Sequence, residues 1–151
     1  MEARSTEPAE VAHKFPLLQG ANDPFSFVSD ELKLVEDNLV RAIRSREQQL
    51  TDISGHLVYG GGKRVRPMVT LLAYSAFGGK RVQDIVDIAT AMELIHTATL
   101  LHDDIIDGAD TRRGKESAFK KYGLKSTLVA GDFLFIKAFE FAGKFDETVV
   151  Q

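Results

Sequence analysis

Apolar residues recur at helical spacing from Ser29 onward. Ser29 is a favourable N-cap residue, and Asp30 and Glu31 follow it in the first turn, where the helix dipole favours acidic side chains. One face of the stretch then carries an apolar residue every three or four positions: Leu32, Val35, Leu39, Ala42 and Ile43. The pattern predicts an amphipathic helix that is capped by Ser29.

Further helical segments follow, and glycines separate several of them. We predict helices over residues 48–57, 67–77 and 82–107, a short piece that ends at 122, and a last helix over 126–143. Pro67 stands at the first position of its predicted helix, where a missing N–H costs no hydrogen bond. Because the chain shows no internal repeat and almost no alternation of period two, we expect an all-α fold, a helical bundle.

The predicted last helix is rich in phenylalanine. Its buried face is predicted to consist of Leu128, Phe135, Phe139 and Ala142. Further aromatic side chains lie elsewhere on it or just after it: Phe133, Phe141 and Phe145. Such a helix lies either in the middle of a bundle or at an interface. Aromatic residues at helical spacing are usually core residues, which favours the first alternative.

Composition and charge narrow the class of protein. The chain has 151 residues, of which 44% are hydrophobic, and a net charge of −3, which suits one domain with its own core. Residues 1–25 contain three prolines and no long apolar run, so we interpret them as a flexible arm ahead of a helical domain over 26–151. No signal peptide or membrane span is expected, and the acidic residues of the arm argue against a transit peptide, which makes the cytoplasm the expected location.

Two classes of site are also excluded. The chain has no cysteine, so it has no disulfide and no thiolate metal centre. Its lysines and arginines are interleaved with acidic residues, so no general basic surface for nucleic acid is expected.

The end of the long predicted helix concentrates acidic side chains. Asp103 and Asp107 are four residues apart and therefore share one helical face, and His96 and Thr99 fall on the same stripe. Acids at a helix C-terminus oppose the dipole, so a positive partner is expected. Salt bridges with the arginines at 112 and 113 are one possibility. We favour a Mg²⁺ site, because this ion prefers carboxylate oxygens and shares its remaining ligands with water and phosphate.

A second candidate site precedes the helix predicted at 67–77. Three glycines are followed by Lys63, Arg64 and Arg66, and basic side chains at a helix start attract anions. The segment is not a Walker A loop, because no Ser or Thr follows the lysine. A solvated basic turn is the alternative here, and a satisfied core histidine is the alternative for His96.

These two segments together resemble a known family. Residues 102–107 (HDDIID) with 110–114 (DTRRG) resemble the first aspartate-rich motif of the trans-isoprenyl diphosphate synthases, or polyprenyl synthetases. Residues 61–67 (GGKRVRP) resemble the segment of that family that binds isopentenyl diphosphate. The resemblance runs from about residue 30 to the end of the chain. Family members are about twice as long and carry a second aspartate-rich motif, so the resemblance is to an N-terminal half and the domain is apparently incomplete at its C-terminus.

The resemblance implies roles for individual residues. It implies that Asp103 and Asp107, with Asp104 as an additional ligand, hold Mg²⁺. It assigns the diphosphate of isopentenyl diphosphate to Lys63, Arg66, His96 and Arg113. Arg112 is implied to bind the allylic diphosphate, and Asp103, Asp107 and Arg112 are the implied catalytic residues. The resemblance also implies a homodimer, and a chain of this length could instead form a heteromer with a complementary subunit.

The implied function is that of a prenyltransferase of isoprenoid biosynthesis. It would condense isopentenyl diphosphate with an allylic diphosphate. In this family the growing product runs along the helix before the acidic motif, where Ala98 and Thr99 are small. We therefore expect a geranylgeranyl or longer product, unless Ala98 is small only because a neighbouring helix packs closely there. The alternative function is a non-catalytic diphosphate-binding or regulatory subunit that needs a C-terminal half or a partner.

Overall fold

A computed structural model describes residues 26–145, and most of that stretch is helical. A single 3₁₀ turn, η2 (Ser26–Val28), leads into the first long helix. The α-helices are α2 (Ser29–Ala42), α3 (Gln48–Val58), α4 (Val65–Ala76), α5 (Val82–Ile106), α6 (Ala118–Tyr122) and α7 (Leu124–Ala142). The only strands among these residues are the short β1 (Thr111–Arg112) and β2 (Lys115–Glu116). The prediction of an all-α helical bundle is confirmed.

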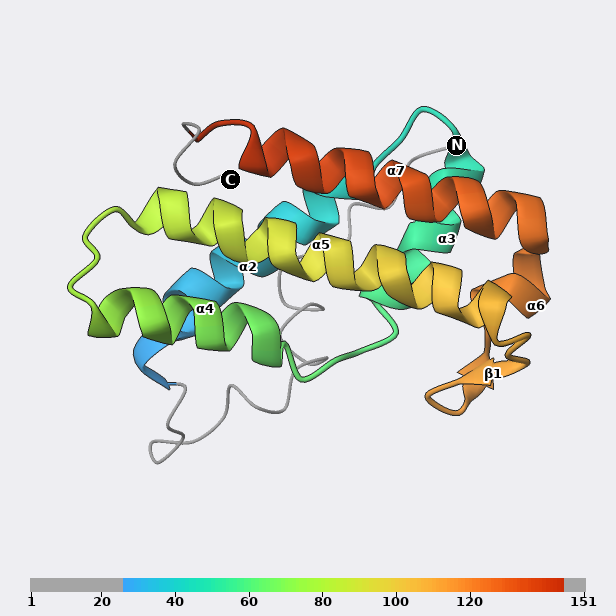
Figure 1. Ribbon diagram of the computed structural model, residues 1–151, viewed down its shortest axis with the longest axis horizontal. Coiled ribbons are helices and arrows are strands. Elements are labelled where there is room, and N and C mark those ends of the chain that lie inside the picture. The colour runs from blue at the N-terminus through green and yellow to red at the C-terminus, as the bar shows by residue number, and fades with distance from the viewer. Residues whose placement is uncertain (1–25, 146–151) are drawn as a thin grey trace, which may run out of the picture.

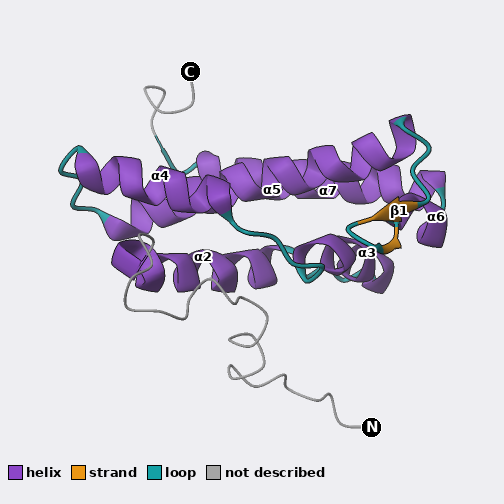
Figure 2. Ribbon diagram, turned by 90° about the horizontal axis from the view of Figure 1, so that it is seen from below, coloured by secondary structure: helices purple, strands orange, loops and turns teal. Residues whose placement is uncertain are grey.

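The helices form two layers around α5. Helices α4, α5 and α7 lie side by side in one layer, and α2 and α3 form the other (Figure 2). Helix α5 runs through the middle, with α7 along one side and α4 along the other (Figure 1). Leu94, Ala98 and Leu101 of α5 are fully buried. Because α5 is apolar around most of its circumference, it can be covered by three helices at once.

Helices α5 and α7 approach closely at one glycine. A Cβ atom built on Gly131 of α7 would lie 2.1 Å from Nε2 of His102 on α5. The His102 imidazole therefore occupies the space that any other side chain at 131 would fill. The same ring nitrogen is 3.2 Å from the carbonyl oxygen of Leu128. These contacts fix the acidic end of α5 against α7.

The burial of α7 differs from the prediction. Leu128 and Phe139 are 43% and 64% exposed, so their assignment to a buried face is wrong. Phe135 and Ala142 are half-buried. The buried residues are instead mostly small: Thr127, Ala130, Gly131, Leu134 and Ala138. Close packing against α5 needs small side chains at the contact, so the larger apolar side chains are turned away from it.

Two predicted helix starts also need correction. Val28, not Ser29, stands at the N-cap of α2, and no side chain caps this helix. Helix α4 begins at Val65, so Pro67 is its third residue and not its first. Proline is still tolerated there, because the N–H groups of a first helical turn have no partner within the helix. The expected arm, residues 1–25, lies outside the described residues.

The hairpin between α5 and α6 was not predicted. Thr111 pairs with Glu116 and Arg112 with Lys115, and the two residues between the strands, Arg113 and Gly114, both have positive φ. Two central residues of this conformation are typical of a tight two-residue hairpin turn. Strands of two residues are too short to show an alternating pattern in the sequence. No helix within residues 26–145 is long and apolar enough to cross a membrane.

Candidate functional site

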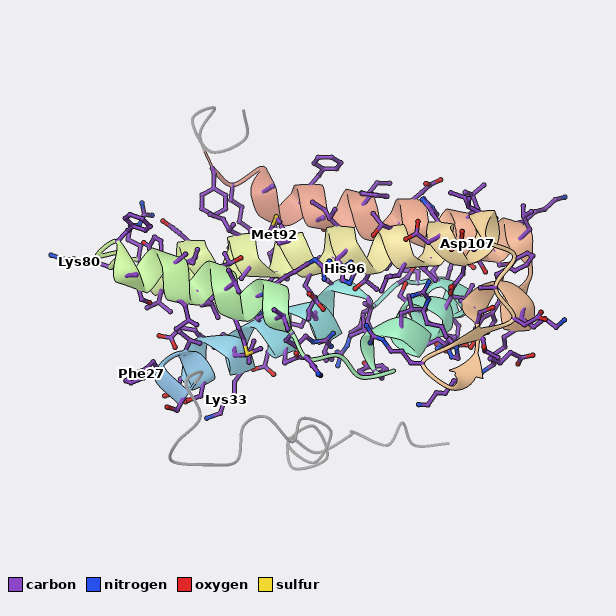
Figure 3. The ribbon with its side chains drawn as sticks, turned by 60° about the horizontal axis from the view of Figure 1, so that its bottom comes forward. Phe27, Lys33, Lys80, Met92, His96 and Asp107 are labelled. Atoms are coloured by element: carbon purple, nitrogen blue, oxygen red, sulfur yellow. The ribbon has the colours of Figure 1, made fainter. Side chains whose placement is uncertain are left out.

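The acidic end of α5 presents two carboxylates to solvent. Asp103 is exposed in the last turn of α5, and Asp107 is exposed at its C-cap. His96 and Thr99 lie half-buried further back on the same helix, where Thr99 Oγ1 donates a hydrogen bond of 2.8 Å to the carbonyl oxygen of His96. Met92, His96 and Asp107 follow one another along α5 (Figure 3). The helix therefore places the predicted side chains in one row.

Asp104 does not belong to that row. Its side chain is fully buried, and its Oδ1 accepts a hydrogen bond of 2.6 Å from Nε of Arg112 in β1. Its Oδ2 is also buried and has no hydrogen-bond partner among the described residues. One residue along a helix turns a side chain by about 100°, which separates Asp104 from Asp103. Asp104 thus orients an arginine, and its implied role as an additional metal ligand stays a prediction.

The glycine-rich loop reaches the hairpin that follows α5. A Cβ built on Gly62 would lie 3.2 Å from Nη1 of Arg113 and 3.3 Å from Nη1 of Arg64. A side chain at this position would be tight against both guanidinium groups, which would have to shift by a few tenths of an ångström. The loop and the hairpin are about fifty residues apart in sequence, and this contact brings their basic side chains together. Lys63 and Arg66 are exposed on either side of Arg64.

Arginines surround His96. Burial, followed by the positive charges of Arg66, Arg113 and Arg112, holds the pKa of His96 below its ordinary value of 6.5, while the charge of Asp103 acts in the opposite direction. The three arginines come from α4 and from the hairpin, so two segments supply positive charge to a histidine on a third. A cluster of like charges is unfavourable by itself and is eased by an anion. His96 and three of the predicted anion-binding arginines, Arg66, Arg112 and Arg113, are therefore close enough to act on one another electrostatically.

An open pocket adjoins this cluster. Helices α3, α5 and α6, the glycine-rich loop and the hairpin all contribute to its wall. The lining residues that carry polar or charged groups include His56, Glu93, His96, Asp104, Arg112 and Arg113. His56 was missed by sequence reasoning: its Nε2 is 2.8 Å from the carbonyl oxygen of Glu116, a contact that ties α3 to β2. A single histidine in an amphipathic helix gives no signal for such a role.

Sequence reasoning also missed a buried ionic cluster behind the loop. Arg64 forms ion pairs with Glu36 of α2 and Glu93 of α5, and all three residues are buried. A signal was present, because both glutamates occupy positions within the apolar stripes of their helices. Buried carboxylates require a positive partner, and the sequence alone does not identify which one.

The described residues do not form a complete metal site by themselves. Between residues 26 and 145, no group of three His, Asp or Glu side chains lies close enough to hold a cation. Asp103 and Asp107 nevertheless fit Mg²⁺ in donor type and exposure, because this ion binds through one or two carboxylates and keeps waters and phosphate oxygens as its other ligands. The two carboxylates would then be one wall of a site that a diphosphate completes.

The two residues expected to bear on product length have different surroundings. Ala98 is fully buried in the core, which agrees with the alternative that a neighbouring helix packs closely there. Thr99 is half-buried and lies on the side of α5 that carries Asp103. The expectation about product length stays a prediction, and Thr99 is the better placed of the two.

Comparison with known proteins decides the family. Residues 47–151 match the sequence profile of the polyprenyl synthetases. The chain belongs to this family. The resemblance carried by the two motifs is thereby confirmed. The chain is 42% identical over 116 residues to heptaprenyl diphosphate synthase component 2 of Geobacillus stearothermophilus, covering 77% of this chain and 36% of that protein.

Two other polyprenyl synthetases give the same result. Octaprenyl diphosphate synthase of Escherichia coli K12 is 41% identical over 102 residues, covering 68% of this chain and 31% of that protein. A polyprenyl synthase from Caulobacter crescentus CB15, solved in complex with calcium and isoprenyl diphosphate, superimposes with a TM-score of 0.76 at 35% identity, covering 79% of this chain and 36% of that one. The chain thus spans about a third of the length of the relatives it matches.

Proposed function

We propose that this chain supplies substrate-binding and metal-binding residues of a prenyltransferase that condenses isopentenyl diphosphate with an allylic diphosphate. The observation that carries the proposal is the convergence of Arg66, Arg112 and Arg113 on His96, about two turns before the exposed Asp103 and about three turns before Asp107 on the same helix. One side of this arrangement suits a diphosphate, and the other suits a metal ion that bridges to a diphosphate. A cytoplasmic enzyme with a geranylgeranyl or longer product is the specific form of the proposal.

The proposed chemistry assigns a task to each group. Mg²⁺, when held by Asp103 and Asp107, would supply positive charge to the allylic diphosphate as its C–O bond breaks and the electron pair leaves with the diphosphate. Arg112, held by Asp104, would bind that leaving group. The double bond of isopentenyl diphosphate then forms a bond to the allylic carbon, and a proton is lost.

Isopentenyl diphosphate, the second substrate, needs a binding site for its diphosphate and surroundings that exclude water. Lys63, Arg66, His96 and Arg113 would hold the diphosphate of isopentenyl diphosphate, so that its double bond faces the allylic carbon. Toward the N-terminus of α5, the row of Asp103 and Thr99 continues into apolar side chains: Ile88, Met92 and Ile95. An apolar wall beside a reactive carbocation limits its capture by water.

A second candidate function is a diphosphate-binding subunit that is not catalytic by itself. It is favoured by the chain's similarity to a protein that is named as component 2 of its synthase. In either case we propose a partner: a second copy of this chain or a complementary subunit. The exposed apolar residues of α7 would contribute to the interface: Leu124, Leu128, Ile136 and Phe139.

Binding measurements test the proposal. We expect geranyl diphosphate to bind the chain in the presence of Mg²⁺, and Asp103→Ala or Asp107→Ala to weaken this binding by about tenfold or more, because a carboxylate ligand of the bridging ion is lost. Titration calorimetry with and without Mg²⁺ measures this effect. Asp37→Ala, which removes an exposed carboxylate from α2, is the matched control. Equal affinity with and without Mg²⁺ would contradict the metal bridge.

A further inference from the structure

The guanidinium group of Arg64 connects three helices. Its Nε and Nη2 donate to the two carboxylate oxygens of Glu36 on α2, at 2.5 and 3.3 Å, and its Nη1 donates to Glu93 on α5 at 3.0 Å. Nη2 also donates to the carbonyl oxygen of Val58, the last residue of α3, at 2.9 Å. The side chain is only 5% exposed. Each nitrogen of this guanidinium is thus engaged by the protein.

The backbone at Arg64 adopts a conformation that this residue type rarely takes. Arg64 has φ of 47° and stands at the N-cap of α4. A left-handed conformation is unfavourable for a residue with a Cβ and persists only when the surroundings hold it. Here the buried side-chain contacts hold it. The turn at Arg64 sets the direction in which Lys63 leaves the loop and Arg66 enters the first turn of α4.

The same cluster provides negative charge behind the basic site. Burial opposes the charged form of Arg64, but the hydrogen bonds and charges of Glu36 and Glu93 outweigh it and raise the pKa of Arg64. Burial raises the pKa of Glu36, although Arg64 acts in the opposite direction. Two glutamates face one arginine, and the guanidinium groups of Arg64 and Arg113 both lie close to Gly62. The excess acid reduces the repulsion between Arg64 and the arginines of the diphosphate site.

We infer that Arg64 is a positioning residue of this site: held by Glu36 and Glu93, it fixes the turn into α4 and with it the placement of Arg66 relative to His96 and Arg113. The inference rests on the proposed function only for the identity of the ligand. Arg64 does not bind the diphosphate itself, because it is buried and its donors are used within the protein. Its effect on the ligand is transmitted through the loop.

Arg64→Lys tests this inference, because lysine keeps the positive charge but lacks the planar guanidinium group that donates to both carboxylates at once. The matched control is Arg44→Lys, at an exposed arginine just after α2. Calorimetric titration with inorganic pyrophosphate and Mg²⁺ is expected to show an affinity about tenfold lower or more for Arg64→Lys, since small displacements of binding groups have effects of this size. The control is expected to bind like the wild type.

A second readout needs no ligand. In an NMR pH titration, with the His96 signal assigned from the spectrum of His96→Asn, Arg64→Lys is expected to raise the pKa of His96 toward 6.5, because Arg66 and Arg113 move away from the ring. Arg44→Lys leaves it unchanged. If Arg64 only stabilised the fold, Arg64→Lys would lower the melting temperature and would not change the pKa of His96 in the folded chain.

The outcomes separate this inference from the proposed function. If wild-type chain fails to bind pyrophosphate but Arg64→Lys still shifts the titration of His96, the proposed ligand is wrong and the positioning role stands. If both affinity and titration match the wild type, the inference is overturned. Glu36→Gln serves if Arg64→Lys does not fold, because Arg64 then keeps Glu93 and the Val58 carbonyl. It is expected to change both readouts in the same direction by a smaller amount, and no change would overturn the inference.

Discussion

Single residues of the aspartate-rich motif have different tasks in this molecule. Asp103 and Asp107 face solvent, whereas Asp104 is buried against Arg112. Three acids that are nearly adjacent in sequence thus have different surroundings, because the helix turns them to different sides. The distinction depends on the hairpin after α5, which returns Arg112 to the buried side.

We predict that Asp104→Asn lowers the stability of the chain and disturbs the position of Arg112, but leaves Mg²⁺ binding unchanged. The amide cannot balance the guanidinium charge, so the free energy of unfolding should fall by about 1–3 kcal/mol, the usual cost of a broken buried polar pair. Urea denaturation measures this change. In calorimetry, the affinity for geranyl diphosphate should fall while its dependence on Mg²⁺ remains. Loss of the Mg²⁺ dependence, as expected for Asp103→Ala, would instead make Asp104 a metal ligand.

His96 should give diphosphate binding a pH dependence. Its pKa in the free chain lies below 6.5 because of burial and the nearby arginines. A bound diphosphate offsets those positive charges and raises this pKa. Binding therefore takes up a proton at pH values between the pKa of His96 in the free chain and that in the complex, and affinity rises as the pH falls through that range. Calorimetry at a pH of about 6 in buffers of different ionisation enthalpy measures the uptake. His96→Asn should bind with less proton uptake, and equal uptake would contradict this assignment.

At the scale of the elements, the contact between α5 and α7 holds the acidic end of α5 in place. The His102 ring fills the notch at Gly131. We predict that Gly131→Ala lowers the free energy of unfolding by about 1–3 kcal/mol through overpacking. Urea denaturation measures this, and His102→Ala in the same chain should recover part of the loss because it removes the clash. A Gly131→Ala chain as stable as the wild type would show that the two helices are not in close contact there.

The same elements show what the sequence could predict. Helix positions were predictable to within a few residues, because apolar periodicity and glycine breaks mark them. The exposed face of α7 was not, because the pattern does not reveal that small residues such as Ala130 and Ala138 form the contact with α5. Similarly, the row of His96, Asp103 and Asp107 follows from helical spacing alone. The pairing of Arg64 with Glu36 and Glu93 depends on how α2 and α5 meet, which no local pattern encodes.

At the scale of the whole molecule, the site lies at an open edge. The two layers bury the core of α5, but the side that carries Asp103 and the apolar Met92 remains exposed within residues 26–145. The relatives that the chain matches are about three times as long. We therefore propose that a further segment or subunit covers this edge and completes the metal site. We also expect the chain by itself to catalyse the condensation slowly or not at all.

Replacement of the matching third of the Escherichia coli relative by this chain tests the proposed function most directly. We predict that the chimera incorporates radiolabelled isopentenyl diphosphate into prenyl products in the presence of Mg²⁺, and that Asp103→Ala with Asp107→Ala abolishes this incorporation without unfolding the chimera. The isolated chain should show little or no incorporation. A chimera that is folded and binds geranyl diphosphate, yet incorporates no label, would contradict a catalytic role for these residues and favour the non-catalytic subunit.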